Sequence, residues 1–184
     1  ELCQWISEKA MELGVDIFPG FPAQKYLTDE SGRVIGIATG DMGIDKEGNQ
    51  KGTYTPGMDI IAKQTIFAEG ARGHLGKQLI KEFNLDEGKT PQHFAIGFKE
   101  IWEVDNDKHS PGDVVHSMGW PLKGGTSGGG FLYHFDNNRI AVGLIVDLNY
   151  SNPSHSPFQE FQQFKQHPSI KQFLESGKRV SYGA

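Results

Sequence analysis

The least ordinary stretch of the chain reads Trp120-Pro121-Leu122-Lys123-Gly124-Gly125-Thr126-Ser127-Gly128-Gly129-Gly130. Five of its last seven residues are glycine, so another group can come close to bare backbone, and main-chain N–H and C=O groups are left free to bind a ligand. The segments around it are apolar or alternating and predict long strands at 94–104, 114–118, 131–135 and 140–148. The glycine-rich stretch is therefore expected to connect two strands of a sheet.

A helical region follows these strands. Ser156-Pro157-Phe158-Gln159 is a capping box with proline at the first helical position. Pro168 ends that helix, and a second short helix is expected over 170–174. The predicted strands are short before Pro91 and long after it. Two domains are therefore predicted, residues 1–91 and 92–184.

The first domain opens with a helix whose apolar residues share one face and which ends at Gly14. Asp29-Glu30-Ser31-Gly32 has the composition of a turn and predicts a hairpin between its flanking strands. The expected strands are 15–18, 24–27, 34–39, two short ones near 42 and 53, 58–62, and 64–68. Together the two halves predict a mixed fold, α+β or α/β.

The last of these strands runs into the bend Ala68-Glu69-Gly70 and then into a helix from Leu75 to Phe83. Doubly wound sheets place cofactors where a strand ends in such a bend. Glu69 is a candidate to accept a hydrogen bond from a ribose or pterin-type group. An ordinary strand-to-helix loop is the alternative, and the pattern alone favours it.

The amino-acid composition excludes some classes of function. Lys+Arg 18 minus Asp+Glu 23 gives a net charge of −5, which argues against duplex nucleic acid as a partner. The longest apolar runs fall well short of the roughly 20 residues that span a bilayer. One cysteine, Cys3, excludes an internal disulfide or a cysteine-ligated cluster within the chain, and the seven histidines have no spacing typical of a metal site. No metal ligand and no catalytic side chain is assigned.

Two motif interpretations of the glycine-rich stretch fail. It is no phosphate-binding loop, because neither Lys-Ser/Thr nor a helix follows it. Gly125-Thr126-Ser127-Gly128-Gly129 matches a nucleophile elbow, but a strand follows instead of a helix. A flexible turn and a ligand contact remain about equally favoured. The flanking Trp120, Leu122, Phe131 and Tyr133 favour a ligand that is flat and apolar.

Several blocks carry a more specific pattern. They are Thr65-Ile66-Phe67-Ala68-Glu69-Gly70-Ala71-Arg72-Gly73-His74-Leu75, Gly119-Trp120-Pro121-Leu122, Gly128-Gly129-Gly130-Phe131-Leu132-Tyr133-His134, His167-Pro168-Ser169-Ile170 and Gly177-Lys178-Arg179-Val180-Ser181-Tyr182-Gly183-Ala184. In this order they resemble the electron-transfer flavoprotein:ubiquinone oxidoreductase family, and the opening region from Trp5 to Gly20 is similar to it as well.

The resemblance implies a monotopic inner-membrane enzyme, bacterial or mitochondrial, with FAD and a [4Fe-4S] cluster. Such an enzyme takes electrons from reduced electron-transfer flavoprotein and passes them to ubiquinone. Residues 1–91 would be part of an FAD-binding domain of the glutathione-reductase type, and 92–184 a quinone-binding domain built from a β-sheet and helices. Gly128 and Gly129 match two backbone glycines that contact the quinone carbonyl, and Ala68-Glu69-Gly70 matches a stretch near FAD.

Parts of the family pattern lie outside these residues. The Gly-x-Gly-x-x-Gly fingerprint is expected before residue 1 and the cluster cysteines after residue 184, and the chain begins without Met. The chain is therefore expected to be an internal piece that by itself holds neither FAD nor the cluster. Ser127 stands where the family pattern has a bulkier tyrosine, so this wall of the pocket is expected to differ.

The resemblance also sharpens the role of the glycines. A quinone carbonyl gains negative charge on reduction, and a backbone N–H stabilises that charge without placing a fixed charge in an apolar pocket. Gly129→Val is therefore expected to weaken quinone reduction in the complete enzyme and to leave its FAD content intact.

Two other functions stay open at this stage. One is a related FAD-dependent enzyme of the geranylgeranyl-reductase type, which reduces isoprenoid double bonds. The other is a non-enzymatic domain that binds an apolar ligand, a lipid or a protein.

Overall fold

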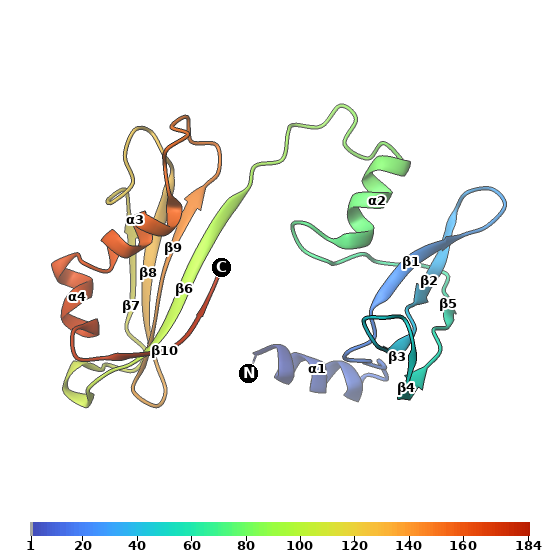
Figure 1. Cartoon of the computed structure of the whole chain (residues 1–184), viewed down its shortest axis with the longest axis horizontal. Helices are drawn as coiled ribbons and strands as arrows, with labels where there is room; N and C mark the ends of the chain where they lie inside the picture. Colours follow the sequence, from blue (N-terminus) through green and yellow to red (C-terminus); the bar gives the residue numbers. More distant parts are fainter. Residues whose placement is uncertain (1) are drawn as a thin grey trace. The chain divides into compact units, whose positions relative to one another are not determined.

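The computed structural model describes residues 2–184, which form two compact units. One unit comprises the residues up to Thr90, and the other runs from Pro91 to Ala184. Figure 1 colours the elements of both units along the sequence. Each unit has its own sheet and helices, so each is described by itself.

The second unit is a five-stranded sheet in the order β10-β6-β9-β8-β7, and every neighbouring pair is antiparallel. Its strands are β6 (Ala95–Glu103), β7 (Val114–Met118), β8 (Gly128–Phe135), β9 (Arg139–Asp147) and β10 (Lys178–Gly183). A short 3₁₀ turn, η1 (Asn106–Lys108), follows β6. The four long strands expected from the sequence are confirmed, with β8 starting three residues earlier than expected. β10 was not predicted, because all six of its residues are exposed and lack the buried face that makes a strand recognisable.

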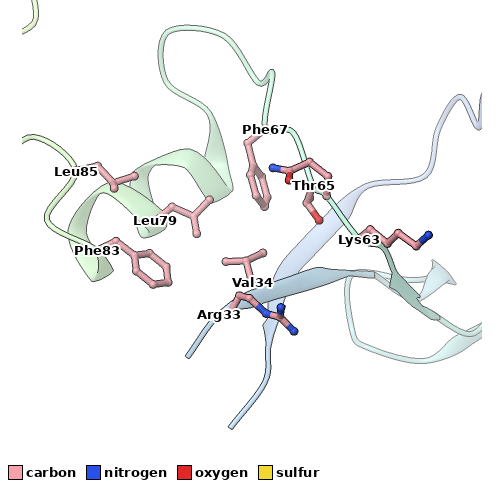
Figure 2. A pocket seen from close by; sticks show the side chains of 9 residues that line it. Arg33, Val34, Lys63, Thr65, Phe67, Leu79, Phe83 and Leu85 are labelled. Carbon is pink, nitrogen blue, oxygen red and sulfur yellow. The ribbon is translucent and has the colours of Figure 1, made fainter. Parts of the chain in front are cut away.

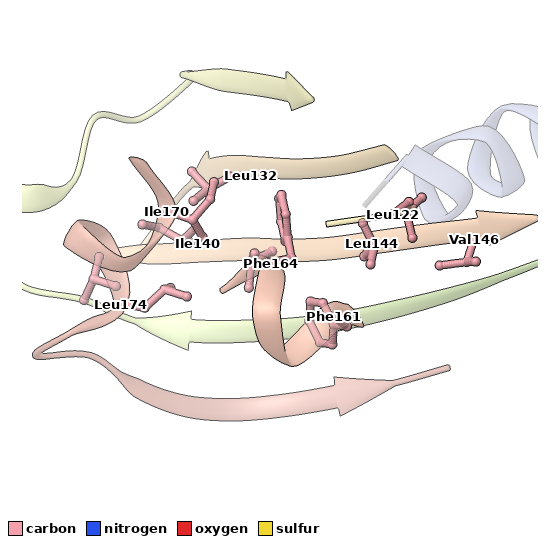
Figure 3. Close-up of a cluster of buried hydrophobic side chains, with 11 residues drawn as sticks. Leu122, Leu132, Ile140, Leu144, Val146, Phe161, Phe164, Ile170 and Leu174 are labelled. Atoms are coloured by element: carbon pink, nitrogen blue, oxygen red, sulfur yellow. The ribbon is translucent and has the colours of Figure 1, made fainter. Parts of the chain in front are cut away.

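Two helices cover one face of this sheet: α3 (Pro157–Phe164) and α4 (Pro168–Leu174). The predicted cap is present, since the Ser156 hydroxyl accepts a hydrogen bond from the Gln159 amide at 3.4 Å. The core fills the space between helices and sheet (Figure 3). Its main members are Leu122, Leu132, Ile140, Val142, Leu144, Val146, Phe161, Phe164, Ile170 and Leu174.

The alternation of side chains along β8 and β9 separates two faces of the sheet. Leu132, Val142 and Leu144 point to the helices and are fully buried. Their neighbours in sequence therefore point to the opposite side, where Ile145 is 38% exposed. That opposite side, made by the odd-numbered residues of β8 and β9, is called the open face below.

The first unit contains helices α1 (Leu2–Glu12) and α2 (His74–Glu82) and two small antiparallel sheets. One sheet has the order β1-β2-β5, with β1 (Ala23–Thr28), β2 (Val34–Thr39) and β5 (Asp59–Ile61). The other pairs β3 (Met42–Ile44) with β4 (Gln50–Thr55). The predicted hairpin turn is confirmed: one carboxylate oxygen of Asp29 accepts hydrogen bonds from the amides of Ser31 and Arg33.

Two predicted strands of the first unit, 15–18 and 64–68, are wrong. Neither segment forms a β-strand, since neither is hydrogen-bonded to any strand among residues 2–184. Most of their apolar side chains are exposed, such as Phe18 at 65% and Ile66 at 85%, whereas Phe67 is half-buried. The predicted mixed fold of helices and strands is found, but all strand pairs among the described residues are antiparallel. The described residues therefore contain no parallel sheet whose carboxyl end would place a cofactor after residues 64–68.

The helices are short. The longest, α1, has 11 residues, all of them exposed or half-buried. Within residues 2–184 no helix is both long and apolar enough to pass through a bilayer.

Candidate functional site

Gly128, Gly129 and Gly130 are the first residues of strand β8, where a loop was expected. β8 lies between β7 and β9, so these residues have neighbours on both sides. Gly129 is opposite Met118 of β7 and Ile145 of β9. The loop proper is the preceding segment, in which Gly124 and Gly125 have φ of +63° and +78°.

Each of the three glycines is required by close packing. A β-carbon at Gly128 would meet the Ile145 carbonyl oxygen, and one at Gly130 would enter the ring of Phe164. At Gly129 it would lie 2.5 Å from the Ser117 carbonyl oxygen. The glycines thus let β7, β9 and α3 approach the start of β8 more closely than any side chain permits.

The hydrogen-bond alternation of antiparallel strands sets the direction of their amides. The Asp147 amide donates to the Ser127 carbonyl at 3.0 Å, so Ser127 faces β9. Alternate residues face alternate sides, which turns Gly129 toward β9 and Gly128 toward β7. Because the register of β7 ends with Met118 opposite Gly129, Gly128 has no residue of the described β7 strand opposite it.

The open face beside Gly129 is apolar. Phe131 and Tyr133 follow on the same side of β8, with their rings stacked at 4.7 Å and 28°. The Phe131 ring lies over Gly143, where a side chain would displace it. On the β7 side Met118 is 90% exposed. This arrangement offers a planar ligand an aromatic wall and a gap without side chains.

The four apolar residues that flank the glycines in the sequence do not all lie on the same face of the sheet. Phe131 and Tyr133 lie on the open face, whereas Leu122 is 8% exposed and belongs to the core. Trp120 lies near His167, with ring centroids 5.0 Å apart. These two rings line a cavity of about 240 Å³ on the helix side, which shares the strand-end residue Met118 with the open face and is otherwise lined by Val115, Ser117, Phe164, Ser169 and Ile170.

The bend Ala68-Glu69-Gly70 is exposed, and its carboxylate is engaged within the protein. Glu69 accepts hydrogen bonds from the amides of Leu75 at 3.2 Å and Gly76 at 2.6 Å. These amides belong to the first turn of α2 and have no acceptor within the helix. The N-cap residue, Gly73, has no side chain that could accept their hydrogen bonds. Glu69 is therefore the capping group of α2, which the ribose or pterin hypothesis did not anticipate.

Removal of this cap gives a local prediction. Glu69→Ala is expected to destabilise α2 by about 1 kcal/mol, because two first-turn amides lose their acceptor. Amide hydrogen exchange at Leu75 and Gly76 should accelerate about fivefold in the variant, as that free energy implies. Glu87→Ala, an exposed carboxylate beyond the helix, is the control and should leave the exchange unchanged. Equal exchange in both variants would contradict the capping role.

A second cavity, of about 450 Å³, lies within the first unit between α2 and the sheet (Figure 2). Val34, Phe67 and Leu79 form its apolar wall, and Arg33 and Lys63 lie at its rim. The hydroxyl of Thr65 is buried there and has no hydrogen-bond partner among the described residues.

A buried ionic network in the second unit was not predicted from the sequence. Glu100 is 3% exposed and accepts hydrogen bonds from Lys165 at 2.9 and 3.0 Å, from the Trp102 indole at 2.8 Å and from Arg179 at 3.1 Å. Burial works to raise the pKa of Glu100, but these donors outweigh it and the pKa is lowered. The two charged partners, Lys165 and Arg179, are 65 and 79 residues from Glu100 in the chain, so no local motif reveals them.

His134 is a second buried polar residue that sequence reasoning missed. It is 4% exposed, its Nδ1 accepts a hydrogen bond from the Ser110 amide at 3.1 Å, and burial lowers its pKa. Its ring is 5.4 Å from that of His109. Among residues 2–184, no three His, Cys, Asp or Glu side chains gather closely enough to hold a metal ion.

Comparison with known proteins supports the resemblance noted in the sequence. A family described as "ETF-QO, ubiquinone-binding" matches residues 94–184, which contain the whole five-stranded sheet. The electron transfer flavoprotein-ubiquinone oxidoreductase of Pseudomonas aeruginosa is 61% identical over 184 residues, which is 100% of this chain and 33% of that protein. The mitochondrial proteins of the same name from Arabidopsis thaliana and Homo sapiens are each 50% identical over the full chain, which covers 29% and 30% of their lengths.

A solved structure shares the fold. It is a triple mutant of the flavin-dependent brominase Bmp2, with a TM-score of 0.61 at 13% sequence identity over 97% of this chain and 41% of that one. The chain spans about a third of the length of the curated relatives it matches. With identities of 50% or more along its whole length, the chain belongs to the electron transfer flavoprotein-ubiquinone oxidoreductase family, and its residues 94–184 match the ubiquinone-binding part of that family.

Proposed function

We propose that the complete protein passes electrons from reduced electron transfer flavoprotein to ubiquinone, and that the second unit binds the quinone ring. The match of residues 94–184 to a ubiquinone-binding family carries this proposal. The relatives' names supply the reaction. The open face supplies a surface of suitable chemistry, apolar with free backbone nearby.

In this proposal the quinone ring lies on the open face at the start of β8. Gly129 provides the gap without side chains, and Phe131 and Ile145 flank it. The amide that serves a quinone oxygen is that of Gly128, since Gly129 faces β9 in the ladder. A main-chain donor stabilises the charge that develops on that oxygen and adds no fixed charge to the site.

FAD and a [4Fe-4S] cluster belong, in this proposal, to the parts of the enzyme outside these 184 residues. A [4Fe-4S] cluster needs four thiolates, and the chain has only Cys3, so its residues do not fit the cluster. For FAD the fit is partial. Ala68 and Gly70 are exposed and offer backbone, while the Glu69 carboxylate is occupied by α2. FAD would accept electrons and pass them on.

The same proposal places the enzyme at the inner membrane, bacterial or mitochondrial, as a peripheral or monotopic protein. Ubiquinone carries an apolar isoprenoid tail and resides in the bilayer, so its reductase has to reach the membrane surface. Relatives from both a bacterium and mitochondria are consistent with this location. Electron transfer flavoprotein is the proposed soluble partner.

The other two functions receive less support. An isoprenoid double-bond reductase of the geranylgeranyl-reductase type would share a flavin fold, but residues 94–184 match a quinone-binding family. A non-enzymatic apolar-ligand domain does not account for relatives that are named as oxidoreductases along the whole chain.

A charge on the wall of the site tests the proposal. In the complete enzyme, Met118→Glu is expected to raise the KM for a short-chain ubiquinone about tenfold, because the quinone would have to desolvate a carboxylate. Met118 is 90% exposed, so the change should leave the fold intact. Met58→Glu, in an exposed loop of the first unit, is the matched control. An unchanged KM for Met118→Glu would contradict a quinone on the open face.

The structure changes what Gly129→Val can test. Any β-carbon at this position collides with the β7 backbone, so the variant would disturb the sheet as well as the ligand. A loss of quinone reduction in Gly129→Val is therefore expected with or without a quinone at this position. Met118→Glu changes an exposed side chain and therefore tests the quinone site without disturbing the sheet.

A further inference from the structure

Two side chains with exchangeable protons meet on the open face. The Tyr133 hydroxyl lies 3.3 Å from Nε2 of His116, and their ring centroids are 5.4 Å apart at 66°. His116 is exposed and Tyr133 half-buried, so the pair can exchange protons with solvent. Neither residue takes part in the core or in the ionic network around Glu100.

The register places this pair next to the proposed quinone position. His116 is opposite Phe131, two residues along the strands from the pair formed by Met118 and Gly129. Gly128 and Phe131 are three residues apart, about 10 Å along the strand, which a six-membered ring with a carbonyl group at each end spans together with a hydrogen bond at each end. A quinone with one oxygen at Gly128 and its ring beside Phe131 therefore brings the opposite oxygen toward the tyrosine and histidine.

The apolar side chains that border this position carry no such proton, and Asp147, which also lies on the open face, is at the Gly128 end of the site, away from the second oxygen. The Met118, Phe131 and Ile145 side chains are apolar, and Gly129 has none. Lys99 does point to the same face, since it is opposite Gly143, which is opposite Phe131. It lies two strands from β8, about 10 Å away, so the Tyr133–His116 pair is the nearer acid.

We infer that Tyr133 donates a proton to the second carbonyl oxygen of the bound quinone and that His116 replaces it. This inference rests on the proposed function and adds the acid that the reaction needs. An amide such as that of Gly128 stabilises charge on an oxygen but does not give up its proton. A hydroxyl coupled to an imidazole does both.

The step balances as follows. Conversion of a quinone to a quinol takes up two electrons, which the reduced flavoprotein donor supplies through the enzyme, and two protons. The Tyr133 O–H bond breaks as the new O–H bond forms on the quinone oxygen. The protonated His116 then passes its Nε2 proton to the tyrosine oxygen and is reprotonated from water. The oxygen at Gly128 takes its proton from solvent.

Steady-state kinetics of the complete enzyme, with reduced electron transfer flavoprotein as donor and a short-chain ubiquinone as acceptor, test this role. Tyr133→Phe keeps the ring stack and removes only the proton. Its kcat is expected to fall at least tenfold, at the low end of what a positioned acid contributes, with little change in KM. The reduction of the enzyme by its donor should stay at the wild-type rate, since that step does not involve the quinone.

Chemical rescue provides a readout that a structural role would not move. His116→Ala opens a gap on an exposed face, and added imidazole should restore its kcat toward that of the wild type. N,N′-dimethylimidazolium fills the same gap but has no N–H, and it should not restore activity. His93→Ala, which removes an exposed histidine elsewhere in the unit, should lose no activity and show no rescue.

The outcomes separate the two proposals. A wild-type kcat in Tyr133→Phe, or equal rescue by both compounds, overturns the proton-donor role. If Met118→Glu still raises the KM in that case, the quinone site stands without this acid. A complete enzyme that does not reduce ubiquinone at all overturns the proposed function and this inference with it.

Discussion

Lys165→Met is expected to destabilise the second unit by about 3 kcal/mol. Lys165 is 9% exposed and its ammonium contacts both carboxylate oxygens of Glu100. Removing one member of a buried pair leaves the other charge without compensation, which typically costs about 3–5 kcal/mol. The lower figure applies here because Arg179 and Trp102 still donate to Glu100.

Hydrogen exchange of β6 and α3 amides in the complete enzyme measures this loss where it arises. Lys171→Met is the matched control, since its pair with Glu175 is 3.8 Å long and exposed. It should cost about 0.5 kcal/mol or less. If both variants exchange alike, the remaining donors satisfy Glu100 and the argument for Lys165 fails.

Acidification should weaken the stabilisation that the network around Glu100 provides. Because the pKa of Glu100 is lower in the folded protein than in the unfolded chain, the network stabilises the fold fully above the ordinary range of a carboxyl group. That stabilisation is lost as the pH falls through the lowered pKa. In Lys165→Met the pKa of Glu100 should lie closer to that of an ordinary carboxyl group, so acidification should cost the variant less stability than the wild type, and the loss should end at a higher pH.

Gly130→Val is expected to destabilise the second unit by about 3 kcal/mol, the upper end of the usual cost of overpacking. Its β-carbon would enter the ring of Phe164, which is 2% exposed and held by α3 and the core. Neither the central strand nor a packed ring can move aside without disturbing other contacts. Urea unfolding of the complete enzyme, monitored at the second unit by hydrogen exchange, measures the change.

A double-mutant cycle identifies the cause. Phe164→Ala makes room for a side chain at position 130, so Gly130→Val should cost much less in that background than in the wild type. Gly52→Val is the control, because a β-carbon there meets no atom within 4 Å. Additive effects of the two core changes would show that the Phe164 ring is not the obstacle.

The sequence predicted the second unit better than the first. The long strands from β6 to β9 and the cap of α3 follow from apolar periodicity and from the Ser156 motif, which are local properties. The segment 64–68 is just as apolar, yet it forms no strand, because a strand needs a partner and the described residues provide none. β10 shows the opposite case, since its pairing with β6 and not its own pattern makes it a strand.

The candidate site was predictable in its chemistry but not in its geometry. Glycine content and nearby aromatic residues indicated a flat apolar ligand. Only the register, however, distinguishes Gly128 from Gly129, or places Leu122 in the core and Phe131 on the open face. The contact between Tyr133 and His116 depends on β7 and β8 being neighbours, which no local motif encodes.

The order of strands has a consequence for how the protein is made. β6 is the first strand of the second unit, yet its outer neighbour is β10, the last. While the ribosome is still adding the intervening residues, one margin of the nascent sheet stays unpaired and Glu100 lacks Arg179. Such an interval exposes a strand edge to aggregation, and it lasts until residues 178–183 emerge. Truncation upstream of Lys178 should therefore yield a chain that depends on chaperones.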